Sequence, residues 1–164
     1  MQHIHFIGIC GTAMGSVAAA MHAKGFTVTG SDENVYPPMS TFLEDQGVEI
    51  FPGFKAENIP ATAEVIVVGN AVSRGNAEAE AALDRKLLYM SLPEVHKEHF
   101  LRGRRNLVVS GTHGKTTTSS MLAWMLKSAG GDPSHMIGGI PGNLGKGAAF
   151  TDSEFVVLEG DEYD

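Results

Sequence analysis

The hydrophobic positions of this chain fall into short apolar runs separated by stretches of helical periodicity. Five runs in the first part are typical of buried strands: residues 4–9, 26–29, 48–51, 64–68 and 87–90. Helical spacing predicts helices that begin near residue 14 and end at Gly25, that span 41–46, and that span 76–86, with Asn76 as an N-cap. Strands that alternate with helices in this way predict an α/β fold, a Rossmann-like parallel sheet covered by helices on both faces.

The pattern restarts after a charged connector, Leu-Arg-Gly-Arg-Arg, at residues 101–105. A strand at 106–110, a glycine-rich loop, a helix at 115–129 and a last strand at 155–158 follow. The helix is predicted to bury one face, formed by Met121, Leu122, Met125, Leu126 and Ala129. We therefore predict a first domain at 1–103 and, at 104–164, the truncated N-terminal part of a P-loop ATPase-type α/β domain.

Composition and charge narrow the possible ligands. A hydrophobic content of 43% supports a packed core, and the single cysteine, Cys10, rules out an internal disulfide. The net charge of −7 argues against a nucleic-acid partner, and no apolar run approaches the roughly 20 residues of a membrane span. We expect a cytoplasmic protein with small-molecule substrates, no membrane contact and no obligate protein partner. Its 20 glycines suggest backbone that approaches ligands closely.

The first glycine cluster, Gly-Ile-Cys-Gly-Thr-Ala-Met-Gly at residues 8–15, joins a strand to a helix. Such a loop presents free helix N–H groups to a diphosphate, whereas a plain tight turn is the simpler alternative. Its spacing departs from the dinucleotide fingerprint, which makes NAD less favoured than another diphosphate. Asp32 stands where a ribose-binding acid is expected. The predicted substrate-binding residues are Gly8, Gly11, Thr12, Ala13, Met14, Gly15, Asp32, Asn70, Ser73 and Arg74.

The second glycine cluster has the context of a P-loop, because it follows a strand and opens a helix. Its predicted nucleotide-binding residues are Gly111, Thr112, His113, Gly114, Lys115, Thr116 and Thr117. The full P-loop pattern requires a glycine where this chain has Val109. Lys115 is the expected phosphate ligand and Thr116 the expected magnesium ligand, whereas a plain turn is the alternative. His113 is either a ligand or a residue that the loop merely tolerates.

Two further segments contain residues that could bind a metal ion. Glu159 follows an apolar strand at the edge where α/β sheets bind ligands, so we predict that it holds Mg²⁺ together with Thr116. The alternative for Glu159 is a solvated acidic loop. His96 and His99 are spaced for one helix face, but without a third ligand a solvated face is favoured over a metal site.

Together these motifs resemble the Mur ligases of peptidoglycan synthesis. The resemblance rests on Gly-Thr-His-Gly-Lys-Thr-Thr (111–117) after a Rossmann-like domain with the loop at 8–15. Within the family, three stretches are similar to members that attach a tripeptide rather than L-alanine: residues 30–40, 69–76 and the terminal Glu-Gly-Asp-Glu-Tyr-Asp (159–164). The resemblance covers essentially the whole chain but only the front part of a three-domain enzyme.

The resemblance implies a reaction and roles for the predicted residues. ATP would phosphorylate the lactyl carboxylate of UDP-N-acetylmuramate, and the amine of L-Ala-γ-D-Glu-meso-diaminopimelate would displace the phosphate from this acyl phosphate. Lys115, Thr116 and Glu159 would be the catalytic residues, acting with ATP and Mg²⁺, and residues 8–15 would hold the UDP part. An L-alanine ligase is the nearer alternative. An NAD-linked oxidoreductase and a non-catalytic nucleotide-binding module are alternatives of other classes.

Overall fold

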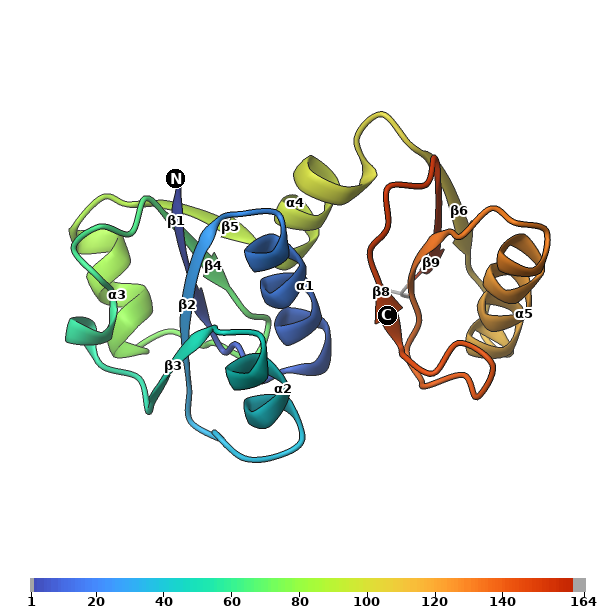
Figure 1. Cartoon of the computed structure of the whole chain (residues 1–164). Coiled ribbons are helices and arrows are strands. Elements are labelled where there is room, and N and C mark those ends of the chain that lie inside the picture. Colours follow the sequence, from blue (N-terminus) through green and yellow to red (C-terminus); the bar gives the residue numbers. More distant parts are fainter. Residues whose placement is uncertain (1, 161–164) are drawn as a thin grey trace. The chain divides into compact units, whose positions relative to one another are not determined.

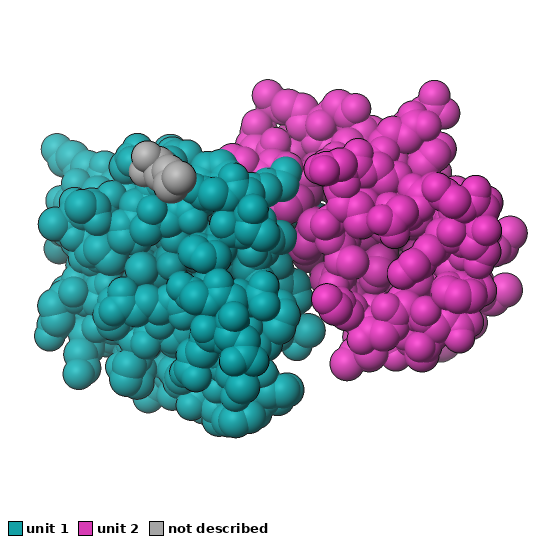
Figure 2. All heavy atoms as spheres, viewed as in Figure 1, with its two compact units in different colours: residues 1–96 teal, residues 97–164 magenta. Residues whose placement is uncertain are grey.

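The computed structural model describes residues 2–160 of the chain. They form two compact units that divide between His96 and Lys97 (Figure 2). This division precedes the expected boundary at 103, because the π-helical turn η2 (Lys97–Leu101) packs with the second unit. The ring of Phe100 in that turn lies 4.3 Å from the ring of Phe150.

The first unit is built on a parallel sheet with strand order β3-β2-β1-β4-β5. Its strands are β1 (His3–Ile7), β2 (Thr27–Asp32), β3 (Glu49–Pro52), β4 (Val65–Val68) and β5 (Leu88–Ser91). The predicted α/β class with a parallel sheet is confirmed. Strand β1 pairs with β2 on one side and with β4 on the other, so the strand order reverses at β1. The carboxyl ends of β1, β2 and β4 therefore meet at the edge where such sheets bind ligands.

Helices cover both faces of this sheet: α1 and α2 lie on one face and α3 on the other (Figure 1). The helical elements are α1 (Thr12–Ala23), α2 (Met39–Asp45), the 3-10 turn η1 (Ala56–Asn58), α3 (Ala77–Asp84) and α4 (Leu92–His96). The predicted N-cap of α3 is confirmed, since Asn76 Oδ1 accepts hydrogen bonds from the N–H groups of Glu78 and Ala79, both at 3.0 Å.

The core of the first unit is centred on β1, in which every residue is buried. Phe6 of β1, Val17 of α1 and Ile66 of β4 are all fully buried, and Ile66 packs with Ile7 of β1 in one apolar cluster. Two histidines of the same strand are also buried, and Thr29 of β2 bonds both: its hydroxyl lies 3.0 Å from His3 Nε2 and 2.9 Å from His5 Nδ1. Burial lowers the pKa of His3 and neighbouring His5 lowers it further, which outweighs the opposite effect of the charges on Glu49 and Glu64.

The second unit has a smaller sheet in the order β6-β9-β7-β8, packed against one long helix. Its elements are β6 (Arg105–Val109), α5 (Lys115–Ser128), β7 (Ser134–Met136), β8 (Ala148–Ala149) and β9 (Phe155–Glu159). Strands β6 and β7 both pair parallel to β9, and β8 pairs antiparallel to β7. Strands β7 and β8 have three and two residues, too few to produce a period in the sequence, and were not predicted.

The predicted buried face of α5 is wrong in part. Met121 and Met125 are 60% and 63% exposed, whereas Ser119 and Ala123 are fully buried. Small residues at 119 and 123 let the helix approach the sheet closely, with Ala123 packed in a cluster that contains Ile137 and Val157. Leu122 and Leu126 flank this cluster, as predicted.

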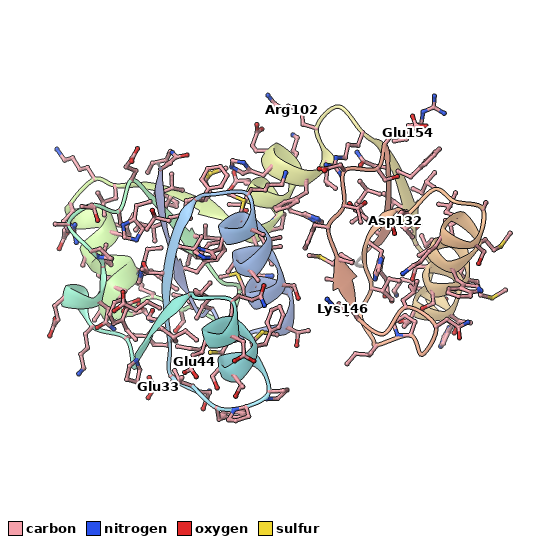
Figure 3. The ribbon with its side chains drawn as sticks, in the orientation of Figure 1. Glu33, Glu44, Arg102, Asp132, Lys146 and Glu154 are labelled. Atoms are coloured by element: carbon pink, nitrogen blue, oxygen red, sulfur yellow. The ribbon has the colours of Figure 1, made fainter. Side chains whose placement is uncertain are left out.

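The basic connector is held by specific partners. Arg104 donates to the carbonyl of Thr151 at 2.6 Å and to Ser134 Oγ at 3.1 Å, which ties the start of β6 to the β7–β8 side of the sheet. Arg102 pairs with Glu98 at 2.7 Å, and Arg105 pairs with Glu154 at 3.1 Å. Arg102 and Glu154 extend from the surface of the unit in Figure 3, so these two ion pairs are exposed and contribute little to stability.

Membrane spans are absent from the part of the chain that the structure describes: no helix in residues 2–160 combines the length and apolarity needed to cross a bilayer.

Candidate functional site

The first glycine loop is held in place by the end of β2. The N–H groups of Gly8 and Ile9 both donate to the carbonyl of Ser31, at 2.8 and 3.0 Å. The N–H group of Cys10 donates to Asp32 Oδ2 at 2.8 Å. Gly8 has φ +86°, a left-handed conformation that lets the chain turn directly out of β1. Three consecutive loop amides are therefore used to fix the loop and do not point to a ligand.

The amides that remain for a ligand belong to the start of α1. This helix begins at Thr12, and helix geometry leaves the N–H groups of Thr12, Ala13 and Met14 without an intrahelical acceptor. Gly11, Thr12 and Ala13 are exposed, whereas Met14 and Gly15 are buried in the unit. A diphosphate at this point would meet backbone N–H groups and the positive end of the helix dipole.

Asp32 has a structural role that the sequence did not predict. Its carboxylate is almost fully buried and accepts from the N–H groups of Cys10 and Asn34, at 2.8 and 2.9 Å. Asp32 thus fixes the glycine loop and the turn after β2. A ribose contact for Asp32 stays a prediction.

Asn70, Ser73 and Arg74 lie in the turn after β4, at the same sheet edge as the glycine loop. All three side chains are exposed. The turn is anchored by Gly69, whose N–H donates to the carbonyl of Ile7 at 3.0 Å. It comes close to the loop, because Val72 Cγ2 lies 3.8 Å from the point where a Cβ on Gly8 would stand. The fold therefore brings the two predicted substrate-binding segments together.

A fully buried carboxylate, Glu78, was not predicted from the sequence. It lies in the first turn of α3 and accepts from the Ser31 hydroxyl, from Asn58 Nδ2 at 2.7 Å and from the Lys55 N–H at 3.2 Å. His5 Nε2 lies 3.6 Å from Oε2, the oxygen that accepts from the Ser31 hydroxyl. Burial alone would raise the pKa of Glu78, but the nearby His5 ring and the hydrogen bonds from Ser31, Asn58 and the Lys55 N–H lower it below the ordinary value. In the sequence, Glu78 is one acid among several in an alternating Ala-Glu stretch.

The second glycine loop connects β6 to α5 with the geometry expected of a phosphate-binding turn. Gly114 has φ +77°, a left-handed conformation in which a side chain would be strained, and α5 begins directly after it. Lys115 Nζ folds back over the loop and donates to the carbonyl of Gly111 at 2.8 Å. The loop residues Gly111, Thr112, His113 and Gly114 are exposed, as are Thr116 and Thr117. The Nδ1 atom of His113 lies 3.2 Å from Oγ1 of the adjacent Thr112.

Thr116 and Glu159 meet although they are far apart in the sequence. The Thr116 hydroxyl donates to Glu159 Oε1 at 2.7 Å, and the Gly138 N–H donates to Glu159 Oε2 at 2.7 Å. Parallel pairing explains the meeting, since Glu159 at the end of β9 is in register with Val109, the last residue of β6. A hydroxyl and one carboxylate beside a phosphate loop are the oxygen donors that suit Mg²⁺. Residues 161–164 of the terminal acidic motif lie outside the described residues.

Clusters of three or more histidine, cysteine or acidic side chains placed to hold a metal are absent among residues 2–160. The expectation of a solvated His96 is wrong, because this residue is 7% exposed at the end of α4. Burial lowers the pKa of His96 to about 4. His96 therefore belongs to the packing of the first unit.

Known proteins resemble this chain in sequence and in fold. The family model described as "Mur ligase family, catalytic domain" matches residues 3–104. The chain is 51% identical over 164 residues to UDP-N-acetylmuramate–L-alanyl-γ-D-glutamyl-meso-2,6-diaminoheptandioate ligase of Haemophilus influenzae, covering all of this chain and 36% of that protein. It is 39% identical over 164 residues to UDP-N-acetylmuramate–L-alanine ligase of a Psychrobacter species, covering all of this chain and 34% of that protein.

A solved structure shares the fold over the whole chain. The crystal structure of UDP-N-acetylmuramate:L-alanyl-γ-D-glutamyl-meso-diaminopimelate ligase from Neisseria meningitidis has a TM-score of 0.92 and 46% identity, covering all of this chain and 54% of that one. The chain thus spans about a third of the length of the curated relatives that it matches. With the family model matched over more than half of its residues, the chain belongs to the Mur ligase family.

Proposed function

We propose that this chain supplies the UDP-sugar-binding domain, at residues 1–103, and the start of the ATP-binding domain, at 104–164, of an ATP-dependent ligase. The enzyme joins UDP-N-acetylmuramate to L-Ala-γ-D-Glu-meso-diaminopimelate in peptidoglycan recycling. The proposal is carried by the 51% identity to a relative of that name across all 164 residues, against 39% for an L-alanine ligase. The L-alanine ligase stays the alternative within the family.

In the first unit, the start of α1 would bind the diphosphate of the UDP-sugar. The exposed amides of Thr12 and Ala13 are available for phosphate oxygens, since the amides of Gly8, Ile9 and Cys10 already have partners. Asn70, Ser73 and Arg74 stand at the same edge, where the guanidinium of Arg74 would add a positive charge near an anionic ligand. This local supply of N–H groups and one cation suits a chain of net charge −7.

In the second unit, the loop at 111–117 would bind the phosphates of ATP. Lys115 Nζ now bonds the Gly111 carbonyl and would exchange this contact for a terminal phosphate oxygen. Thr116 and Glu159 would hold Mg²⁺, which neutralises phosphate charge when it is bound. The Gly138 N–H keeps the Glu159 carboxylate oriented toward Thr116.

The chemistry would proceed through an acyl phosphate. The lactyl carboxylate oxygen attacks the terminal phosphorus of ATP and ADP leaves. The tripeptide amine then attacks the acyl carbon, loses a proton, and phosphate departs as the amide forms. In phosphoryl transfer, positioning and charge neutralisation supply most of the catalysis, and Lys115 contributes to both.

Calorimetry with UDP-N-acetylmuramate and with NAD tests the ligand of the first unit. We expect the chain to bind the UDP-sugar and not NAD; tight NAD binding without a response to the UDP-sugar would favour an oxidoreductase instead. In the complete protein, Lys115→Ala should abolish ligation and leave UDP-sugar binding intact, and an unchanged rate would remove Lys115 from the site. Lys127→Ala, on the last turn of the same helix, is the matched control.

The 164-residue chain by itself should bind nucleotide without forming the amide bond, as a non-catalytic module would. Its matches cover about a third of each curated relative, so most of the ligase would be missing. Detection of ligated product with this chain alone would contradict the expectation. Cytoplasmic location and the lack of a protein partner stay predictions.

A further inference from the structure

We propose that Glu78 is a positioning residue for the first glycine loop: its buried carboxylate fixes Ser31, and Ser31 fixes the loop amides, so this contact sets the affinity for the diphosphate ligand. The inference rests on the proposed function, in which that loop and the start of α1 bind the UDP part of the substrate.

The carboxylate of Glu78 contacts three separate segments of the first unit, namely β1, the end of β2 and residues 55–58. It accepts from Ser31 at the end of β2, from Asn58 in η1 and from the backbone of Lys55, and it faces His5 in β1. Its side chain and that of His5 are both fully inaccessible to solvent. A carboxylate in such a place is costly to bury unless its hydrogen bonds are satisfied, and here both oxygens have donors.

Ser31 transmits this contact to the glycine loop. Its hydroxyl bonds Glu78 on the α3 face of the sheet, while its carbonyl accepts both Gly8 and Ile9 amides, at 2.8 and 3.0 Å. The next residue, Asp32, accepts the Cys10 amide. Ser31 and Asp32 of β2 therefore accept hydrogen bonds from three consecutive amides of the loop. Glu78 in turn accepts a hydrogen bond from the Ser31 hydroxyl.

Ligand binding depends on the direction of the amides that follow the glycine loop, in the first turn of α1. The first turn of α1 comes directly after the held segment, and its N–H groups bind an anion well only if their directions converge on it. Fixing Ser31 fixes the turn at Gly8 and the path into α1 before the ligand arrives. A preorganised site loses less freedom on binding and therefore binds more tightly.

Glu78→Gln weakens this contact without removing the side chain. The glutamine oxygen can still accept from Asn58 and the Lys55 N–H, but its amide N–H then faces the Ser31 hydroxyl, which loses its carboxylate acceptor and can only accept a neutral hydrogen bond. Ser31→Ala removes the same contact from the other side and keeps the Ser31 carbonyl. Ile66→Val is the matched control, because Ile66 is fully buried in the apolar cluster beneath α3 and has no polar contact to the loop.

The test is calorimetry of the 164-residue chain with UDP as the probe, at a temperature where circular dichroism shows every variant folded. We expect the Kd for UDP to rise about tenfold in Glu78→Gln and in Ser31→Ala, which corresponds to about 1.4 kcal/mol. The double variant should be no weaker than either single one, since both remove one contact. Ile66→Val should lower the melting temperature and leave the Kd unchanged.

Equal UDP affinity of wild type and Glu78→Gln would overturn the inference and leave the proposed function standing. So would a loss of affinity in Ile66→Val as large as that in Glu78→Gln, because general destabilisation would then be the cause. Failure of the wild-type chain to bind UDP at all would count against the proposed function itself, and with it against this role of Glu78.

Discussion

Gly30 in the middle of β2 is a position at which one added methyl group should strongly destabilise the first unit. A Cβ built on Gly30 would stand 2.6 Å from Ile9 Cδ1, 2.7 Å from the carbonyl oxygen of Phe6 and 2.8 Å from Ile9 Cβ. Phe6 is the register partner of Gly30 in β1. The Ile9 side chain is fully buried and branched at Cβ, so it has little room to rotate away.

The expected cost of Gly30→Ala is the balance of two effects. Overpacking in a closed core typically costs about 1–3 kcal/mol, and a clash with backbone places this site near the upper end. Alanine also reduces the conformational freedom of the unfolded chain, which offsets about 0.4–1 kcal/mol of this loss of stability. The net loss should be about 2 kcal/mol, equivalent to a fall of roughly 8–16 °C in the melting temperature of a domain of this size.

Hydrogen exchange measured by mass spectrometry isolates the effect to the first unit. Amides of β1 and β2 that exchange only through unfolding of this unit should exchange about 30-fold faster in Gly30→Ala. Gly142→Ala is the control, because a Cβ at Gly142 meets no atom within 4 Å, and its exchange should match wild type. Unchanged exchange of β1 and β2 in Gly30→Ala would show that the strands accommodate the added methyl group with no loss of stability, which would contradict this prediction.

Three further predictions concern single side chains of the first unit. Asn76→Ala removes the α3 cap and should cost about 1 kcal/mol in thermal unfolding, whereas Asn76→Asp should keep most of the stability. The pKa of His96 falls to about 4 on folding, so the unfolded chain binds a proton at a higher pH than the folded chain does. The free energy of unfolding should therefore drop by about 3 kcal/mol as pH falls from 6.5 to 4. In denaturant unfolding measured across this pH range, His96→Asn should show a smaller drop. Burial, then the charges of Asp32 and Glu44, raises the pKa of the Cys10 thiol to about 11, so iodoacetamide should label it about a hundredfold more slowly at pH 8 than a thiol of pKa 9; labelling at the rate of a small free thiol would contradict this.

The first unit was largely predictable, because its strands are regular apolar runs and its turns carry glycine. Parallel pairing and the N-cap at Asn76 follow from local sequence patterns, whereas the reversal of strand order at β1 does not. The second unit was less predictable from the sequence. Its β7 and β8 strands are too short for a period, and the buried face of α5 depends on small residues that a hydrophobic pattern does not mark.

By itself, the sequence determined the α/β class, the two glycine loops and the types of residue around them, since each is a local pattern. Only the tertiary structure decided which groups meet: Thr116 with Glu159, Asp32 with the Cys10 amide, and Glu78 with Ser31. The reason is physical. Helical and strand periods describe neighbours along the chain, whereas these contacts join residues more than twenty positions apart, and their partners are set by strand order and register.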